Sequence, residues 1–476
     1  MNPAVQAVCD AAQARTRAIF PAVAADWAGG ILLCTILASS LAFIDGSVVN
    51  VGLPAIGADF TAHAGDLTWV INAYLLPLSA LLLLGGAAGD RFGSGRLLII
   101  GTGLFGIASV VCAFAPNFSW LLIGRSAQGV GAALLMPNSL AILGASFSGE
   151  ARGHAIGLWA AIGAVMGAVG PVLGGWLIDH LGWRAIFFLN LPPALGAILL
   201  ALLFVRQAPS DEDKTALDLS GGLLATAALG SITWALTIGT GAAGWTGGAL
   251  GLLLTGILLL AAFLVVEKAK GDRAMMPLSI YSSSRFVGLS LFTWFLYAAL
   301  GALMVLVPFV LIAAAGWSGT GAGAALTPFA LIMAAISPLA GRVAGRIGPR
   351  WPLILGPLAV AAGFLLLLRL EADADYVTDI LPGIVLIALG MSAAVAPLTT
   401  AVLSSVGAAH TGSVSGLNSA LARTAGMIAT ALLGGVLNAR GAVLLHGFAV
   451  AMIACAAAAV IASLSAFFLV RAGEGR

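Results

Sequence analysis

The sequence predicts an all-α membrane protein of fourteen transmembrane helices, arranged as two six-helix bundles with two additional helices between them. The prediction rests on the low charge content, a series of long apolar runs and an internal repeat. Of the 476 residues, 61% are hydrophobic and 8% are charged, whereas soluble globular chains carry about 25% charged residues. So few charges cannot cover a water-facing surface, and the chain is therefore expected to lie in a bilayer.

The apolar runs give the helices. Lipid offers the backbone no hydrogen-bond partner, so each run is expected to be helical, and about 20 helical residues cross the hydrocarbon core. In chain order the runs are 31–56, 68–88, 97–115, 119–143, 155–178, 186–205, 217–238, 248–266, 287–314, 322–340, 351–368, 380–403, 412–437 and 444–469. The predicted domains are a cytoplasmic segment at 1–30, a first bundle at 31–205, a linker with the additional pair at 206–286, a second bundle at 287–470 and a cytoplasmic tail at 471–476.

The distribution of Lys and Arg gives the orientation. With the N-terminus in the cytoplasm, sixteen of the 21 basic residues fall in cytoplasmic segments. Arg184, Arg369 and Arg440 then face outward, and Arg125 and Arg423 lie within spans. This excess agrees with the rule that short cytoplasmic loops are rich in Lys and Arg. The sequence therefore predicts a multi-pass protein of the inner (plasma) membrane with both termini in the cytoplasm.

Two sets of positions recur at nearly equal distances along the chain. Gly86, Arg91, Gly93 and Gly101 recur 255 positions later as Gly341, Arg346, Gly348 and Gly356. Gly153, Gly157, Leu158, Gly167 and Gly175 recur 259 positions later as Gly412, Gly416, Leu417, Gly426 and Gly434. Both sets pair helices on either side of 217–266, so the additional helices lie between two similar halves. Transporters built from two such halves bind their substrate between them, near the bilayer midplane.

The sequence lacks the residues that several other classes of protein require. The net charge of +2 provides no basic surface for nucleic acid. The four cysteines are scattered singly, so no metal site is expected. The sequence holds neither a phosphate-binding loop with a lysine nor a nucleophile elbow, so enzymatic activity is not expected. We expect a monomer that uses the proton gradient and no cofactor, with protons, a small-molecule substrate and membrane lipid as its partners.

A glycine-rich loop joins the second and third spans. It reads Gly86-Ala-Ala-Gly-Asp90-Arg91-Phe-Gly93 and is followed by Arg96. Glycines allow a tight turn and close helix approach, and Asp90 can bind cationic side chains or helix N-termini in one conformation only. The stretch resembles the cytoplasmic loop motif of the major facilitator superfamily, which lies at the same place. A basic loop that only sets the topology is the alternative interpretation.

Two spans of the first half carry further motifs of this superfamily. In the fourth span, Leu122-Ile-Gly-Arg125-Ser-Ala-Gln128-Gly129-Val-Gly131 resembles the motif whose buried Arg is tied to proton coupling. In the fifth, Gly167-Ala-Val-Gly170-Pro171-Val-Leu-Gly174-Gly175 resembles the antiporter motif of drug-exporting members. The alternatives are an Arg that braces helices through backbone carbonyls, and small residues that only pack.

Other stretches are similar to the fourteen-span drug:proton antiporter subfamily. They are Asp45-Gly-Ser47-Val-Val-Asn50-Val-Gly-Leu-Pro54 in the first span and Trp183-Arg184-Ala-Ile-Phe187-Phe188-Leu-Asn190-Leu-Pro192 after the fifth. Asn418 and Arg423, before Gly426, look like the penultimate helix of the same subfamily. The resemblance implies the major facilitator fold, alternating access between two bundles, and multidrug export in exchange for protons.

Asp45 is the leading candidate for the proton site, because it is the one carboxylate near the middle of a span. Removal from water penalises a charged carboxylate, so protonation can act there as a switch. Arg125 is its expected counter-charge if the first and fourth spans approach each other; a helix-bracing hydrogen bond is the alternative. The resemblance implies conformational roles for Gly86, Asp90, Arg91, Gly93, Arg96, Gly170, Pro171, Gly174 and Gly175.

A substrate cavity is expected from polar, aromatic and Met residues within the spans. They are Asn50, Asn72, Tyr74, Gln128, Met136, Asn138, Trp159, Trp294, Tyr297, Asn418 and Arg423. The sequence thus predicts a proton-coupled antiporter that exports hydrophobic small molecules, foremost cationic drugs. A dedicated exporter of an endogenous lipid, metabolite or antibiotic would carry the same motifs. A membrane receptor or scaffold that transports nothing is the alternative from another class.

The predicted orientation can be measured with reporter fusions that are active on one side of the membrane only. Because of the basic bias, fusions after Arg96, Lys214, Arg273 and Arg350 should report the cytoplasm, and fusions after His63, Trp245 and Asp375 the exterior. A cytoplasmic signal at 241–247 would contradict the predicted additional pair and reduce the number of spans to twelve.

Overall fold

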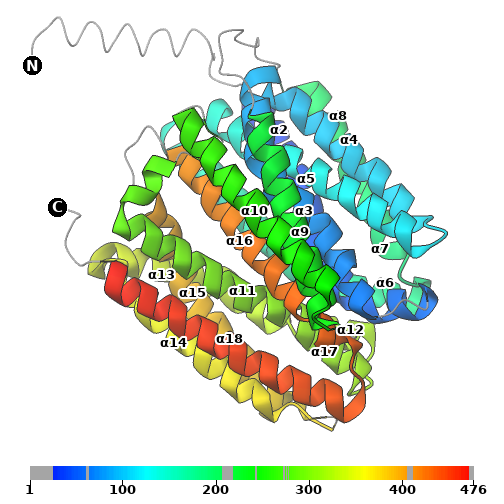
Figure 1. The fold of residues 1–476 in the computed structure, drawn as a ribbon. Coiled ribbons are helices and arrows are strands. Elements are labelled where there is room, and N and C mark those ends of the chain that lie inside the picture. Colours follow the sequence, from blue (N-terminus) through cyan, green and yellow to red (C-terminus); the bar gives the residue numbers. More distant parts are fainter. Residues whose placement is uncertain are drawn as a thin grey trace, which may run out of the picture.

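The computed structural model describes residues 25–60, 64–205, 218–241, 244–271, 274, 276, 278–371, 373–404 and 411–470. Within these ranges the chain forms helices and no strands, packed side by side in one bundle (Figure 1). The first half consists of α2 (Ala25–Phe60), α3 (Ala64–Phe92), α4 (Ser94–Ala113), α5 (Phe118–Ser146), α6 (Gly149–Leu181), α7 (Ala185–Phe188) and α8 (Leu191–Phe204). These helices cover the first six predicted spans.

The additional pair and the second half follow. The pair is α9 (Leu219–Thr240) and α10 (Gly247–Lys270). The second half consists of η2 (Leu278–Ser282), α11 (Ser284–Ala313), α12 (Gly319–Ala324), α13 (Thr327–Ile347), α14 (Arg350–Leu366), η3 (Leu367–Arg369), η4 (Tyr376–Ile380), α15 (Leu381–Ser404), α16 (Thr411–Leu432), α17 (Gly434–Asn438) and α18 (Gly441–Leu469). In this half, breaks divide three of the predicted spans into α12 and α13, α14 and η3, and α16 and α17.

Thirteen helical segments of the described residues are long and apolar enough to cross a membrane. Each coincides with one of the predicted spans. The remaining predicted span, 412–437, is α16 with α17, and α16 is not among the thirteen. It packs against α11 and α3 inside the bundle, where polar residues such as Asn418 and Arg423 need not face lipid.

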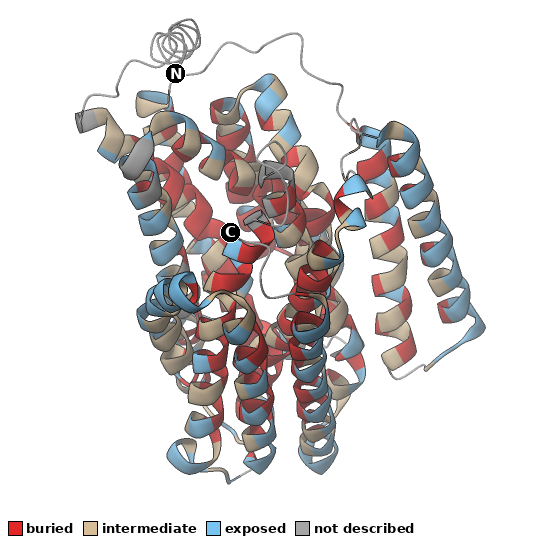
Figure 2. Cartoon of the chain, turned by 90° about the vertical axis from the view of Figure 1, so that its left-hand side faces the viewer, coloured by how far each residue is buried: buried red, intermediate tan, exposed pale blue. Residues whose placement is uncertain are grey.

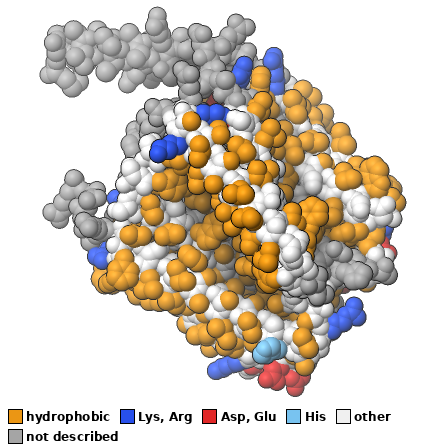
Figure 3. Space-filling model, in the orientation of Figure 1, with side chains coloured by type: hydrophobic (Ala, Val, Ile, Leu, Met, Phe, Trp, Pro, Cys, Tyr) orange, Lys and Arg blue, Asp and Glu red, His pale blue; other side chains and the backbone are white. Residues whose placement is uncertain are grey.

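The outer surface has the character of a lipid-facing surface. Large apolar side chains are exposed along it, including Leu199 and Leu202 on α8 and Leu258 and Val265 on α10. In Figure 2 the outward faces of many helices are exposed while their inward faces are buried. The space-filling view in Figure 3 shows a broad apolar face with the charged side chains near its margins. This arrangement fits a multi-pass membrane protein.

The repeat detected in the sequence corresponds to equivalent packing in the two halves. Gly93, after α3, and Gly348, after α13, both have left-handed φ angles, of 98° and 83°. A Cβ on Gly101 of α4 would lie 2.8 Å from the carbonyl oxygen of Gly131 on α5. A Cβ on Gly356 of α14 would likewise lie 2.8 Å from the carbonyl oxygen of Gly390 on α15. In each half, glycines therefore allow the same two helices to touch through their backbones.

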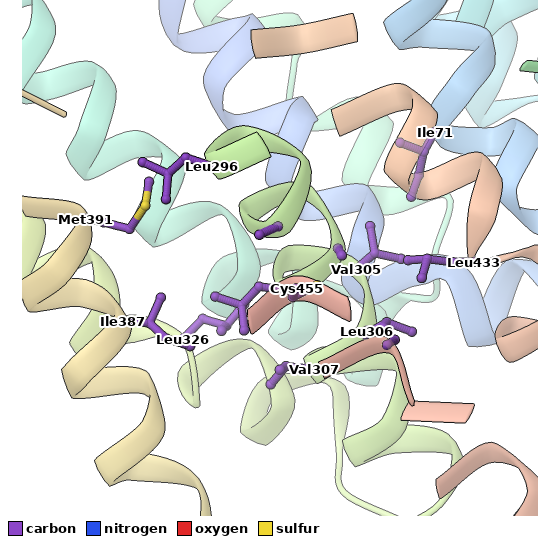
Figure 4. Close-up of a cluster of buried hydrophobic side chains, with 14 of the residues drawn as sticks. Ile71, Leu296, Val305, Leu306, Val307, Leu326, Ile387, Met391, Leu433 and Cys455 are labelled. Carbon is purple, nitrogen blue, oxygen red and sulfur yellow. The ribbon is translucent and has the colours of Figure 1, made fainter. Parts of the chain in front are cut away.

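Buried apolar side chains from both halves form one large cluster. In Figure 4, Ile71 of α3 lies near Val305 of α11, and Leu326, Ile387 and Cys455 pack in the second half. A second cluster fills the first half among α2, α3, α4, α5 and α8. Of the additional pair, α9 packs against both α3 and α16, and α10 packs against α9.

The close approach of α4 and α5 predicts a difference between two neighbouring glycines. Gly101→Ala should destabilise the protein by about 1–3 kcal/mol, because the new methyl group would overlap backbone atoms of α5. Gly103→Ala is the matched control on the same helix, because its Cβ would meet no atom within 4 Å. Thermal unfolding of the purified proteins in detergent measures both. Equal melting temperatures for the two variants would contradict this packing.

Candidate functional site

An ion pair lies buried in the first half. Arg125 of α5 donates from Nη1 to Oδ2 of Asp45 of α2 at 2.5 Å, and their side chains are 1% and 0% exposed. The Nε of Arg125 donates to the carbonyl oxygen of Val70 on α3 at 2.9 Å. The expected approach of the first and fourth spans is therefore present. One guanidinium connects three helices.

Polar side chains complete the hydrogen bonding around this pair. Gln128 accepts from Arg125 Nη1 at 2.7 Å and donates to Asp45 Oδ1 at 3.3 Å and to Ser109 at 2.8 Å. Asn190 also donates to Asp45 Oδ1, at 3.2 Å, and to Ser109, at 3.2 Å. Buried charges are tolerated when such bonds satisfy them. The carboxylate of Asp45 is thus held by one cation and two amides.

Two aromatic rings enclose the guanidinium of Arg125. Its Cζ lies 4.6 Å from the ring centre of Tyr74 and 5.9 Å from that of Phe187. A cation over an aromatic face gains electrostatic stabilisation, and the gain is larger away from water. The rings therefore help to hold the charged form of Arg125 in a site that excludes bulk solvent.

A cavity adjoins the ion pair between the two halves of the chain. Its larger compartment, of about 560 Å³, is lined by residues of α2, α3, α6, α11, α13, α15 and α16. Its smaller compartment, of about 270 Å³, is bordered by Asp45 and Arg125. The two compartments share Tyr74, Tyr297 and Arg423. The two compartments therefore adjoin, and a molecule bound in the larger one would lie next to the compartment that the ion pair borders.

Five of the eleven predicted cavity residues line this space. They are Asn50, Tyr74, Tyr297, Asn418 and Arg423. Six others do not line either compartment: Asn72, Gln128, Met136, Asn138, Trp159 and Trp294. Residue type within a span predicts these six, but the rotation of each helix decides whether such a residue faces the cavity.

The six predicted residues that do not line the cavity lie elsewhere in the bundle. Gln128 belongs to the network around Asp45. Asn138 donates to the carbonyl oxygen of Gly85 at 3.0 Å and so joins α5 to α3. Trp159 donates to Ser39 at 2.9 Å. Met136 packs in the core of the first half, Asn72 is fully buried, and Trp294 is half-buried.

The Gly-Pro stretch of α6 brings this helix against both halves. A Cβ on Gly170 would lie 2.2 Å from Oγ of Ser47, and one on Gly174 would lie 2.0 Å from Val48, both on α2. A Cβ on Gly175 would instead lie 2.1 Å from the carbonyl oxygen of Gly319 on α12. Pro171 lines the cavity, and it has no N–H for the carbonyl oxygen four residues earlier. The glycines therefore allow α6 to touch α2 and α12 closely. Because Pro171 has no N–H, the carbonyl oxygen of Gly167 lacks its hydrogen bond within the helix.

The glycine-rich loop motif lies at the end of α3 and the start of α4. Gly93 is the left-handed residue between the two helices, and Asp90 and Arg96 are exposed. The guanidinium of Arg91 lies 5.5 Å from the ring of Phe92. The tightest approach to α5 is at Gly89, whose Cβ would lie 1.6 Å from Oδ1 of Asn138. Gly86, by contrast, has room for an ordinary contact.

Sequence reasoning missed two members of the network, Ser109 and Asn190. Both are polar residues in apolar surroundings, at 0% and 1% exposure. Asn190 stands in the stretch that resembles the drug antiporters, which was a usable signal. Ser109 has no comparable signal, because an isolated serine in a span is common among small packing residues.

Comparisons with known proteins identify relatives of the chain. The sequence pattern of the Major Facilitator Superfamily matches residues 35–431 and 289–475. The "Multidrug resistance protein Stp" of Mycobacterium tuberculosis is 32% identical over 411 residues, which cover 86% of this chain and 75% of that protein. The "Tetracenomycin C resistance and export protein" of Streptomyces glaucescens is 30% identical over 412 residues, with 86% and 76% covered.

A solved structure shares the fold. It is that of a bacterial homolog to the human lysosomal transporter Spinster, in an inward-facing and occupied conformation. The TM-score is 0.65 at 17% identity, and the match covers 94% of this chain and 98% of that one. At this identity the likeness extends to the fold alone.

The buried ion pair predicts non-additive stability changes. Arg125→Gln should cost about 3–5 kcal/mol, because it leaves Asp45 buried without its cation, and adding Asp45→Asn should recover part of that loss. The control is Arg184→Gln, which breaks a pair with Asp59 whose side chains are 42% and 44% exposed; its cost should be at most about 1 kcal/mol. Unfolding of the purified proteins measures these values. Purely additive effects of the two buried substitutions would contradict the pairing.

Proposed function

The chain belongs to the major facilitator superfamily, a family of membrane transporters and not of enzymes, and we propose that it is a proton-coupled antiporter that exports hydrophobic small molecules. The observation that carries the proposal is the buried Asp45–Arg125 pair at the wall of the cavity. Relatives named for drug and antibiotic resistance support export as the direction of transport.

The ion pair gives protons a point of action. Protonation of Asp45 would remove the negative charge that Arg125 binds, and would so weaken contacts that join α2, α3 and α5. Asp45 borders the cavity, so a proton has a route to it when the cavity is open to water. One charge that crosses 100 mV releases about 2.3 kcal/mol, which can drive export against a moderate gradient.

The contacts between the halves support alternating access. At the C-terminal end of α6, Asp179 accepts hydrogen bonds from the backbone N–H groups of Gly319 and Thr320, at 2.9 and 2.8 Å. Near this end, α6 and α12 touch through Gly175 and Gly319. With the predicted orientation, that end faces the exterior. The halves would then be closed on the outside, with the cavity loading from the cytoplasm.

The fourteen-span arrangement is part of the same proposal. Thirteen apolar segments are present among the described residues, and α16 with α17 would be the remaining span. This helix packs against α11 and α3 and lines the cavity through Asn418 and Arg423. Its lower hydropathy is then a consequence of its place in the bundle, since a helix that lipid does not surround can carry polar groups. An even number of spans keeps both termini in the cytoplasm.

The cavity wall supports a hydrophobic cargo. Phe43, Leu75, Met304, Phe329 and Met333 line the larger compartment, and flexible Met side chains adapt to different apolar shapes. A dedicated exporter of a single compound is the second candidate, and the relative named for tetracenomycin C resistance and export favours it. Proton movement in vesicles, measured with a panel of compounds, distinguishes the two: a multidrug exporter responds to many and a dedicated exporter to one.

The coupling role of Asp45 is directly testable. Asp45→Asn should abolish proton-driven export by the protein that is folded and inserted, because an amide cannot take up and release a proton. Arg125→Lys should keep part of the activity, since Lys retains the charge without the planar fork of donors. Asp59→Asn is the matched control on α2, because this carboxylate is exposed, and it should export as the parent does. Substrate accumulation in proteoliposomes under a proton gradient measures all three.

If well-expressed Asp45→Asn protein still concentrates substrate at the parent's rate, Asp45 only braces the helices. A loss of expression shared by the Asp45 and Arg125 variants would point the same way.

A further inference from the structure

The cavity contains a second arginine, which the ion pair does not use. Arg423 lies on α16 and borders both compartments. The residues of α16 that line the cavity recur every three or four positions, as expected for one side of a helix. They are the pairs Asn418–Ser419 and Ala422–Arg423, followed by Gly426 and Thr430. Arg423 is half-buried and lines the cavity.

Arg423 lacks the partners that Arg125 has. Among the described residues it forms no ion pair and no hydrogen bond. The titratable groups close enough to act on its charge are Tyr74 of α3 and Tyr297 of α11, and tyrosines are neutral at physiological pH. Asp45 is the one carboxylate among the described residues that line the cavity, and Arg125 neutralises it. The described cavity wall therefore carries one positive charge in excess.

An uncompensated guanidinium within a membrane protein is costly, so a site that keeps one is suited to an anion that brings the missing charge. The planar fork of Arg matches the two oxygens of a carboxylate or phosphate group. Tyr297 lies on the same wall, and its hydroxyl can donate to such an anion. The hydroxyl of Tyr74 already donates to the carbonyl oxygen of Ala42. Asn418 is held in place by Thr293, at 2.7 Å, and borders the same compartment.

We propose, on the basis of the proposed export function, that the cargo is an amphiphilic organic anion. Its oxyanion binds Arg423 beside Tyr297, and its apolar body occupies the larger compartment beside Phe329 and Met333. This assignment replaces the cationic cargo expected from the sequence. A cation would meet the excess positive charge of this wall, because the one carboxylate among the described lining residues is already paired with Arg125.

A series of probes with one apolar body and different charges tests the proposal. Pyrenebutyrate is anionic, pyrenebutanol is neutral and pyrenebutylamine is cationic, and binding of each to the purified full-length protein is measured by fluorescence. The parent should bind pyrenebutyrate at least about tenfold more tightly than pyrenebutanol, and pyrenebutylamine most weakly. Arg423→Gln should remove the preference for the anion, and Arg423→Lys should keep part of it.

Arg369→Gln is the matched control, because it removes an exposed charge on η3, away from the cavity, and should preserve the preference. The proposal is overturned if the parent binds the amine as tightly as the carboxylate, a result that does not depend on the folding of any variant. It is also overturned if Arg423→Gln keeps the anion preference. Transport is scored separately: a parent that moves no compound of a broad panel would refute the export function, whereas the anion site is judged by binding alone.

Discussion

A carboxylate that is taken out of water inside a membrane must have a counter-charge, and the first half of this protein is organised around that requirement. Asp45 is fully buried, and Arg125 binds it at 2.5 Å. An exposed pair of the same kind would contribute little, but a buried pair cannot lose one member cheaply. Gln128 and Asn190 then satisfy the second oxygen of Asp45. The pair thereby fixes how α2, α3, α5 and α8 meet.

Glycines make this approach of the helices possible. A Cβ on Gly129 of α5 would lie 2.3 Å from the carbonyl oxygen of Tyr74 on α3. A Cβ on Gly85 of α3 would lie 2.0 Å from the carbonyl oxygen of Ala133 on α5. Two helices can approach so closely only when no side chain stands between their backbones. The same explanation covers Gly356 and Gly390 in the second half. Polar bonding and close packing therefore support each other: the glycines bring α3 and α5 together, and Arg125 joins them through Val70.

The spans and the ion pair could be predicted from the sequence, whereas most of the cavity could not. A span is a property of some twenty successive residues, so composition shows it directly. Asp45 and Arg125 stood out because each is a charge within an apolar run, and mutual pairing is the least costly arrangement for both. Asn138 and Trp159 are equally polar in sequence, yet they bond to Gly85 and Ser39 and do not line the cavity. Helix rotation depends on packing across the whole bundle, which no local pattern shows.

Of the additional pair, α9 lies beside the part of the interface where α3 packs against α16 and α17. Near one end of α3, Leu83 occupies the space where a Cβ on Gly416 of α16 would lie, at 2.7 Å, and α17 also packs against α3. On the opposite side, the close contacts of α6 with α12 involve the second half of α6, from Pro171 onward. Under the proposed alternating access, the α6 side can open while the α3 side stays packed. Helix α9 contacts α3 and α16 together, so it lies over the side that need not separate. Its placement there adds a helix pair without obstructing the movement that transport requires.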